Sequence, residues 1–107
     1  MTGRHFALIG AMLASGALGP ATALAQSSAD AGRYVAANCA NCHGTQGVAK
    51  GAMPSLAGQK KEDIIEQMRA FRDGKRPATV MHQLAKGYTD AQIEAAAEFF
   101  ARQPAAR

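Results

Sequence analysis

The 107-residue chain has no tryptophan, two tyrosines and four phenylalanines, so aromatic side chains can supply little of a core. It also has only two cysteines, so a zinc site built from four thiolates cannot form. The formal net charge is +4, or +3 without Arg4, whereas a nucleic-acid-binding domain usually carries a strong basic stripe. These absences indicate a small domain that needs a further stabilising group and that does not bind nucleic acid.

The first residues have the pattern of a secretory signal. Arg4 precedes an apolar stretch from Phe6 to Leu18, and the small-residue site Ala23–Ala25 follows. The alternative is an uncleaved membrane anchor, but glycines and a proline interrupt the stretch, and a span needs about 20 continuous apolar residues. We therefore predict a signal peptide over residues 1–25, export to the periplasm, and one domain over residues 26–107 with no membrane span.

The two cysteines stand in the motif Cys39-Ala40-Asn41-Cys42-His43, and three chemistries use a C-x-x-C pair. A redox dithiol needs a preceding strand and a βαβ context, and no such strand is apparent. A structural zinc site needs four ligands, and His5 and His82 form no second pair. Covalent haem needs two thiols for the porphyrin vinyl groups and an adjacent histidine for the iron. The motif therefore favours covalently attached haem.

The spacing of this motif has a physical reason. On a helical turn residues i and i+3 point to the same side, so Cys39 and Cys42 can reach two vinyl groups of one flat ring. A large, covalently fixed porphyrin would also fill the core that the few aromatic residues leave small. Its two propionates would bring the net charge of residues 26–107 close to +1.

The rest of the chain predicts helices and no strands. A helix is expected from Ala31 to Asn38, a glycine-rich loop from Gly44 to Gly58, and an amphipathic helix from Lys61 to Asp73. One or two helical turns are expected over residues 80–86. Thr89 and Gln92 have the spacing of a capping box before a last amphipathic helix, whose buried face is expected to hold Ile93, Ala96, Ala97 and Phe100.

This order of elements around C-x-x-C-H resembles the bacterial class I cytochromes c over the whole of residues 26–107. The segment Pro54–Gln59 is similar to the P-x-L-A-G-Q of small members of that family. The resemblance implies an all-α small cytochrome c fold, with three main helices and loops around one covalently attached haem c. It also implies that the Pro54 carbonyl accepts a hydrogen bond from the proximal imidazole. The family commonly has an aromatic residue where this chain has Val35 and Ala36.

The resemblance implies a second iron ligand opposite His43, and the soft or nitrogen candidates are Met53, Met68, Met81 and His82. Met68 lies on the apolar face of a helix and is expected in the core. Met53 adjoins the proline that is expected to contact the proximal imidazole, so it belongs on the same side of the ring. Met81 follows His43 by 38 residues and matches the methionine position of the family. We predict Met81 as the ligand, with His82 as the main rival.

The resemblance implies a carrier of single electrons with no catalytic residue. Two alternatives from other classes are a five-coordinate enzyme, in which Met81 is displaceable and His82 is the polar distal group, and a structural protein with a disulfide or zinc at the cysteines. The segment Lys75–Asp90 resembles the cytochrome subunit of flavocytochrome c sulfide dehydrogenase, which implies a sulfide-oxidising flavoprotein as a partner. A freely diffusing carrier is the competing interpretation. Six basic residues are candidates for a docking surface: Lys50, Lys60, Lys61, Lys75, Arg76 and Lys86.

Overall fold

The computed structural model describes residues 21–107, with side chains from residue 28 onward, and this part of the chain contains helices and no strand. The helices are α1 (Ala21–His43), α2 (Lys61–Arg72), α3 (Met81–Leu84) and α4 (Asp90–Ala101), with short 3-10 helices η1 (Thr45–Gly47) and η2 (Ala85–Gly87). The all-α prediction is confirmed. Residues 1–20 of the predicted signal peptide lie outside the described residues, so its cleavage stays a prediction.

Helix α1 is longer than the predicted helix over residues 31–38, and that prediction was wrong at both ends. No residue between Cys39 and His43 breaks a helix, so α1 continues through the whole C-x-x-C-H motif. It ends at Gly44, whose φ of 82° lies in the region that favours glycine and whose N–H donates to the carbonyl of Ala40 at 3.0 Å. The motif is therefore part of a regular helix.

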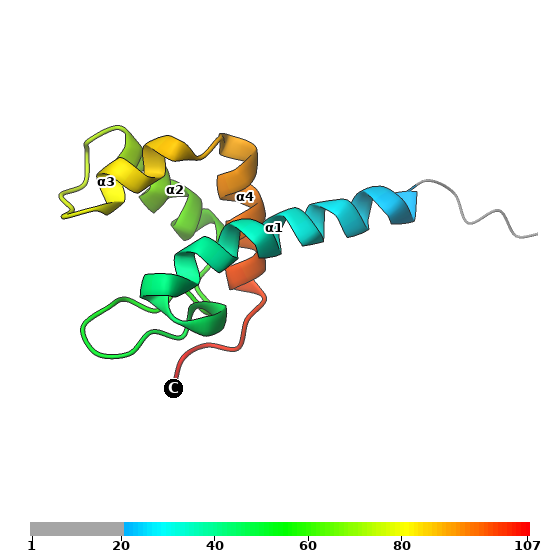
Figure 1. The fold of residues 1–107 in the computed structure, drawn as a ribbon, viewed down its shortest axis with the longest axis horizontal. Helices are drawn as coiled ribbons and strands as arrows, with labels where there is room; N and C mark the ends of the chain where they lie inside the picture. The colour runs from blue at the N-terminus through cyan, green and yellow to red at the C-terminus, as the bar shows by residue number, and fades with distance from the viewer. Residues whose placement is uncertain (1–20) are drawn as a thin grey trace, which may run out of the picture.

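Helices α1 and α4 cross closely (Figure 1), and Gly32 makes this possible. A Cβ atom at Gly32 would lie 2.5 Å from the carbonyl oxygen of Ala95, closer than such atoms approach. The absence of a side chain at Gly32 therefore permits the close approach of the two helices. One turn further along α1, Ala36 is buried in the core. The crossing is thus built from small residues.

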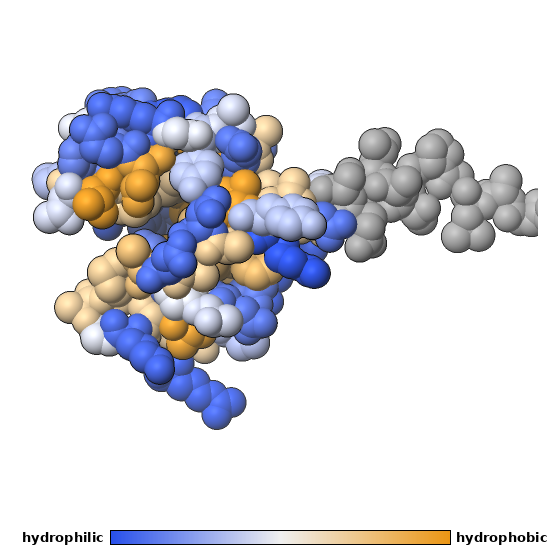
Figure 2. All heavy atoms as spheres, in the orientation of Figure 1, coloured by the Kyte–Doolittle hydropathy of each residue, from blue (hydrophilic) through white to orange (hydrophobic). Residues whose placement is uncertain are grey.

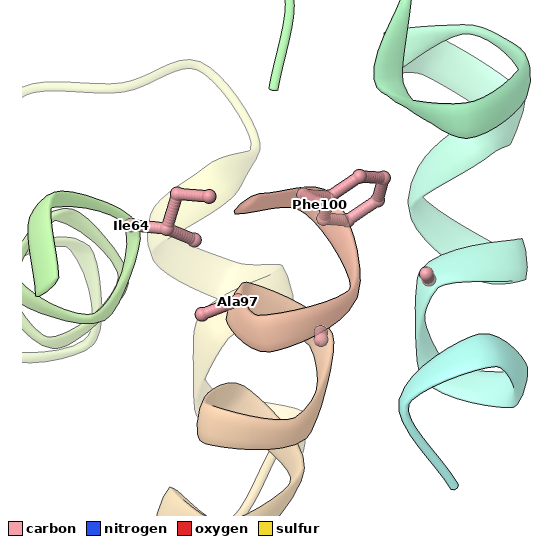
Figure 3. Packing of buried hydrophobic residues seen from close by; sticks show 5 residues of the cluster. Ile64, Ala97 and Phe100 are labelled. Atoms are coloured by element: carbon pink, nitrogen blue, oxygen red, sulfur yellow. The ribbon is translucent and has the colours of Figure 1, made fainter. Parts of the chain in front are cut away.

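The core lies where α4 meets α1 and α2 (Figure 3), and its buried cluster is Ala36, Ile64, Ala96, Ala97 and Phe100. The predicted buried face of α4 is confirmed, because Ile93 is buried as well. Met68 packs against the cluster from α2, as predicted. The Phe99 and Phe100 rings meet edge to face, with centroids 5.4 Å apart.

Helix α4 begins at the predicted capping box, in which Thr89 and Gln92 each satisfy a backbone N–H of the other. Its polar face is joined to α2 by ion pairs. Arg72 lies 2.8 Å from Asp90, and Lys61 lies 3.0 Å from Glu98. The capping box defines the start of α4, and the exposed ion pairs add contacts between α4 and α2. Among the described residues no helix has the length and apolar character that a membrane crossing requires.

Candidate haem site

The two thiols lie at the C-terminal end of α1, in different environments. Cys39 is partly buried, its thiol lies 3.6 Å from the carbonyl oxygen of Val35, and burial raises its pKa. Cys42 is exposed, and no disulfide joins the two. Because they are three positions apart on a regular helix, both side chains point to one side of α1, as covalent attachment to one flat ring requires.

His43 is the one buried polar or charged side chain that the described residues show, with 7% of its surface exposed. Its Nδ1 donates a hydrogen bond to the carbonyl oxygen of Pro54 at 2.7 Å. A carbonyl oxygen can only accept, so Nδ1 carries the proton and Nε2 keeps its lone pair. The ring is therefore held in the tautomer that a metal at Nε2 requires.

The loop after α1 is folded back so that Pro54 reaches His43. The carbonyl of Gly47 accepts hydrogen bonds from the backbone N–H groups of Leu56 at 2.8 Å and Ala57 at 3.1 Å. The hydroxyl of Ser55 accepts from the N–H of Ala49 at 3.0 Å. These contacts lie within the glycine-rich loop that was predicted from Gly44 to Gly58. Ser55 was missed, and only its place within the Pro54–Gln59 segment pointed to it.

The four candidates for the second ligand lie in different surroundings. Met81 is the first residue of α3 and is partly buried. His82, beside it, has a buried Nδ1 atom with no hydrogen-bond partner. Met53 is exposed next to Pro54, whereas Met68 packs against the core cluster. Met68 is therefore a core residue, and Met53, Met81 and His82 remain as candidates for the second ligand.

Two segments have surfaces suited to a porphyrin: the loop of residues 44–58, which contains Pro54, and residues 80–84, which contain Met81. Among the described side chains, five large apolar ones are strongly exposed, and four of them belong to the segments that contain Pro54 or adjoin Met81: Val48, Met53, Val80 and Leu84. Figure 2 shows the surface hollowed between the two segments, with orange side chains on the upper wall. These groups suit a haem. The imidazole of His43 can ligate the iron, the two thiols can attach the ring, and exposed apolar side chains on both walls can cover it.

The fold and the motif at the end of α1 are those of a class I c-type cytochrome. The family model described as cytochrome c oxidase, cbb3-type, subunit III matches residues 26–100, and the chain belongs to this family. Its cofactor is accordingly a covalently bound haem c, as the sequence predicted. Electron transport is the function of the cytochromes that it is similar to.

Several relatives are longer than this chain. The cytochrome subunit of sulfide dehydrogenase from Chlorobaculum tepidum is 41% identical over 69 residues, which are 64% of this chain and 63% of the relative. The thiosulfate dehydrogenase electron acceptor of Thiomonas intermedia is 41% identical over 70 residues, or 62% of this chain and 32% of that protein. The solved structure of Acidithiobacillus ferrooxidans cytochrome c4 is 33% identical, with a TM-score of 0.66, and the match covers 70% of this chain and 49% of that one. The chain thus spans less than two thirds of each.

Proposed function

We propose that the chain is a periplasmic carrier of single electrons, with haem c attached through Cys39 and Cys42 and with its iron ligated by His43 and Met81. The observation that carries this proposal is the bond from His43 Nδ1 to the Pro54 carbonyl, because it leaves Nε2 free for iron and fixes the plane of the ring. The bound haem supplies a reversible one-electron iron couple. No acid, base or nucleophile is required of the polypeptide.

In this proposal each residue has a separate task. The thiols fix the ring covalently to α1. The Pro54 carbonyl accepts the hydrogen bond from His43 Nδ1, which makes the imidazole a stronger ligand. The thioether of Met81 fills the remaining position, which raises the reduction potential and leaves no site for oxygen or peroxide. Met81 is preferred to Met53, because Met53 adjoins the residue that is bonded to His43 and so belongs on the proximal side.

Haem staining and absorption spectra test the attachment. We expect peroxidase stain at the mass of the chain after denaturing electrophoresis, and an alkaline pyridine haemochrome typical of two thioether bonds. Cys39→Ala should reduce or abolish the stained product. If acid acetone extracts all the haem from the unaltered protein, covalent attachment through these cysteines is wrong.

The periplasmic location rests on the predicted signal over residues 1–25, and cell fractionation tests it. We expect the stained protein in the osmotic-shock fluid, with Gln26 as its first residue by N-terminal sequencing. Recovery in the cytoplasmic fraction, with Met1 still present, would contradict the proposal.

A second candidate function is that of haem subunit for a sulfide-oxidising flavoprotein. Its support is the 41% identity to the sulfide dehydrogenase subunit of Chlorobaculum tepidum. A subunit should hide apolar area in a stable complex, whereas a free carrier makes a small transient contact. Affinity purification from the native periplasm, followed by addition of sulfide, separates the two. Recovery of the cytochrome alone, with no haem reduction by sulfide and the candidate flavoprotein, supports the free carrier.

A further inference from the structure

The loop that presents the Pro54 carbonyl to His43 is held at its far end by residues that follow α4. Gly58 closes this loop, and its N–H donates a hydrogen bond to the carbonyl oxygen of Phe100 at 2.9 Å. A Cβ atom at Gly58 would lie 2.8 Å from both the Cα and the Cβ atom of Ala105. The chain at Ala105 therefore crosses directly over Gly58, and in Figure 1 the red segment after α4 runs down beside the green loop.

Two residues fix the path of the chain from the end of α4 to Ala105. The backbone N–H of Gln103 donates to the Phe100 carbonyl at 3.1 Å, and its side-chain Nε2 donates to the Phe99 carbonyl at 2.8 Å. These bonds satisfy carbonyl groups that the end of a helix leaves without partners. Pro104 follows, and its ring fixes φ and prevents continuation of the helix. The segment is therefore directed to Gly58 by contacts of its own.

A short series of hydrogen bonds connects Gly58 to the residue that contacts His43. Gln59, which follows Gly58, donates from its side-chain Nε2 to the carbonyl oxygen of Ser55 at 2.5 Å. Ser55 adjoins Pro54, whose carbonyl accepts from His43 Nδ1 at 2.7 Å. A displacement of Gly58 therefore moves the backbone that carries the Pro54 carbonyl.

The start of the loop is held independently of the segment after α4. A Cβ atom at Gly47 would lie 2.7 Å from Cδ1 of Phe100, so the ring of Phe100 packs against the backbone there. The carbonyl of Gly47 also accepts the hydrogen bonds from Leu56 and Ala57. Residues 103–107 take no part in these contacts, so the domain should fold without them while the end of the loop loses a support.

We propose that residues 103–105 position the proximal ligand, because by covering Gly58 they hold the loop that is bonded to His43. The inference rests on the proposed function and adds a determinant of the reduction potential outside the haem-binding residues named above. A hydrogen bond accepted from Nδ1 makes the imidazole a stronger donor to iron, which stabilises the ferric state. Loss of the segment should weaken this bond and so raise the potential.

Deletion of residues 103–107 tests the proposal in the holoprotein, since Cys39 and Cys42 are unchanged. At a fixed ambient potential near the midpoint, we expect the ratio of ferrous to ferric protein to rise about threefold. In the ferrous protein, the Nδ1 proton of His43 should exchange with water about tenfold faster, as measured by NMR, because the loop opens more often.

Deletion of residues 106 and 107 alone is the matched control, because it also removes Arg107 but leaves Ala105 over Gly58. Both measured values should match those of the unaltered protein. The proposal is wrong if the longer deletion leaves potential and proton exchange unchanged, or if the shorter one changes them as much. A polypeptide without covalent haem would have no potential to measure, and that result would refute the proposed function on which the inference rests.

Gln103→Met distinguishes positioning from a general loss of stability. Methionine is similar in length to glutamine but has no donor for the Phe99 carbonyl, so the segment loses one anchor while chain length and charge are kept. We expect potential and His43 proton exchange to change in the same direction as in the longer deletion, by a smaller factor. A destabilised Gln103→Met protein with unaltered potential and exchange would show a structural role only and contradict the proposal.

Gly58→Ala, made in the full chain and in the chain without residues 103–107, tests whether the segment acts through Gly58. The φ of 72° at Gly58 strains an alanine in both chains, whereas the contact with Ala105 is present only in the full chain. We therefore expect Gly58→Ala to accelerate His43 proton exchange by a larger factor in the full chain. Equal factors in the two chains would show that Ala105 does not act through Gly58 and would overturn the proposal.

Discussion

One hydrogen bond determines the roles of the two ring nitrogens of His43. Nδ1 donates to the carbonyl of Pro54 at 2.7 Å, so Nε2 is the nitrogen left with a lone pair. A hydrogen bond of this kind raises the basicity of the imidazole and fixes its plane. The carbonyl belongs to the backbone, so the contact depends on the path of the loop and less on the side chain at position 54.

Met81→Ala tests whether the thioether of Met81 is the second ligand of the iron. We expect loss of the weak near-infrared band of a thioether on ferric haem, and binding of added cyanide or imidazole. The reduction potential should fall by on the order of 0.1 V, a fraction of the range of about 0.8 V that axial ligands span. Met53→Ala is the matched control and should leave spectrum and potential unchanged. The assignment fails if Met53→Ala has these effects and Met81→Ala does not.

His82→Ala completes this comparison. The buried Nδ1 of His82 has no hydrogen-bond partner, and the substitution leaves the proposed thioether in place. We therefore expect a near-native spectrum in both oxidation states. Loss of the near-infrared band in His82→Ala, with the band retained in Met81→Ala, would move the ligand to the histidine.

Among the elements, the crossing of α1 and α4 depends on the absence of a side chain at Gly32. Gly32→Ala puts a Cβ atom 2.5 Å from the carbonyl oxygen of Ala95, so the two helices must move apart. We expect the free energy of unfolding to fall by about 1–3 kcal/mol in spite of the better helix propensity of alanine. Denaturant titration of the holoprotein measures this change in the free energy of unfolding.

Gly87→Ala is the control for this change, because a Cβ atom there meets nothing within 4 Å. Its effect should lie within about 0.5 kcal/mol of zero. Equal effects of the two substitutions would show that loss of backbone freedom, and not the close crossing, determines the result.

The ion pairs between α2 and α4 give stability a dependence on pH. The hydrogen bond from Arg72 is the main cause that lowers the pKa of Asp90. A lowered pKa in the folded state means that the stabilisation is present above the unfolded pKa and is lost as the pH falls through the folded one. We therefore expect Asp90→Asn to be less stable at pH 7, by a small amount because the pair is exposed, and to match the unaltered protein in strong acid.

Thermal unfolding between pH 7 and the acid limit measures this difference. Arg72→Gln should show the same loss at neutral pH, and the double variant should lose little more than either single one. A difference between Asp90→Asn and the unaltered protein that stays constant down to the acid limit would contradict the assignment to this pair.

At the scale of the whole molecule, the polypeptide alone makes a small core. In the part of the chain whose side chains the structure describes, the buried apolar residues are Ala36, Ala57, Ile64, Ala85, Ile93, Ala96, Ala97 and Phe100. Five of these eight are alanines, which leaves three large side chains to exclude water. Small domains of this kind usually need a further group for stability, and a covalently held porphyrin would also cover the exposed apolar residues on both sides of the hollow in Figure 2.

The variant with both Cys39→Ala and Cys42→Ala tests this dependence after free haem has been removed. We expect weak helical circular dichroism and no cooperative thermal transition, whereas the holoprotein should unfold cooperatively. Unchanged helicity and an unchanged midpoint in the variant would show that the polypeptide core is sufficient.

The sequence by itself determined the features that depend on neighbouring residues. The C-x-x-C-H spacing predicted haem c, the Thr89 capping box predicted the start of α4, and the apolar periodicity predicted its buried face. Each of these is set within one or two helical turns, where chain geometry fixes which side chains meet. The contact between His43 and Pro54 spans 11 residues and was expected only through resemblance to a family.

The tertiary structure alone decided which distant residues meet. Gly32 contacts Ala95, and Lys61 pairs with Glu98 at 3.0 Å. A shallow groove beside Cys42, in which Lys50 is the one charged lining residue, depends on how the loop of residues 44–58 returns over the end of α1. Spacing along the chain does not contain this information, because loops of many glycines allow many paths and only the packing of α1, α2 and α4 selects one.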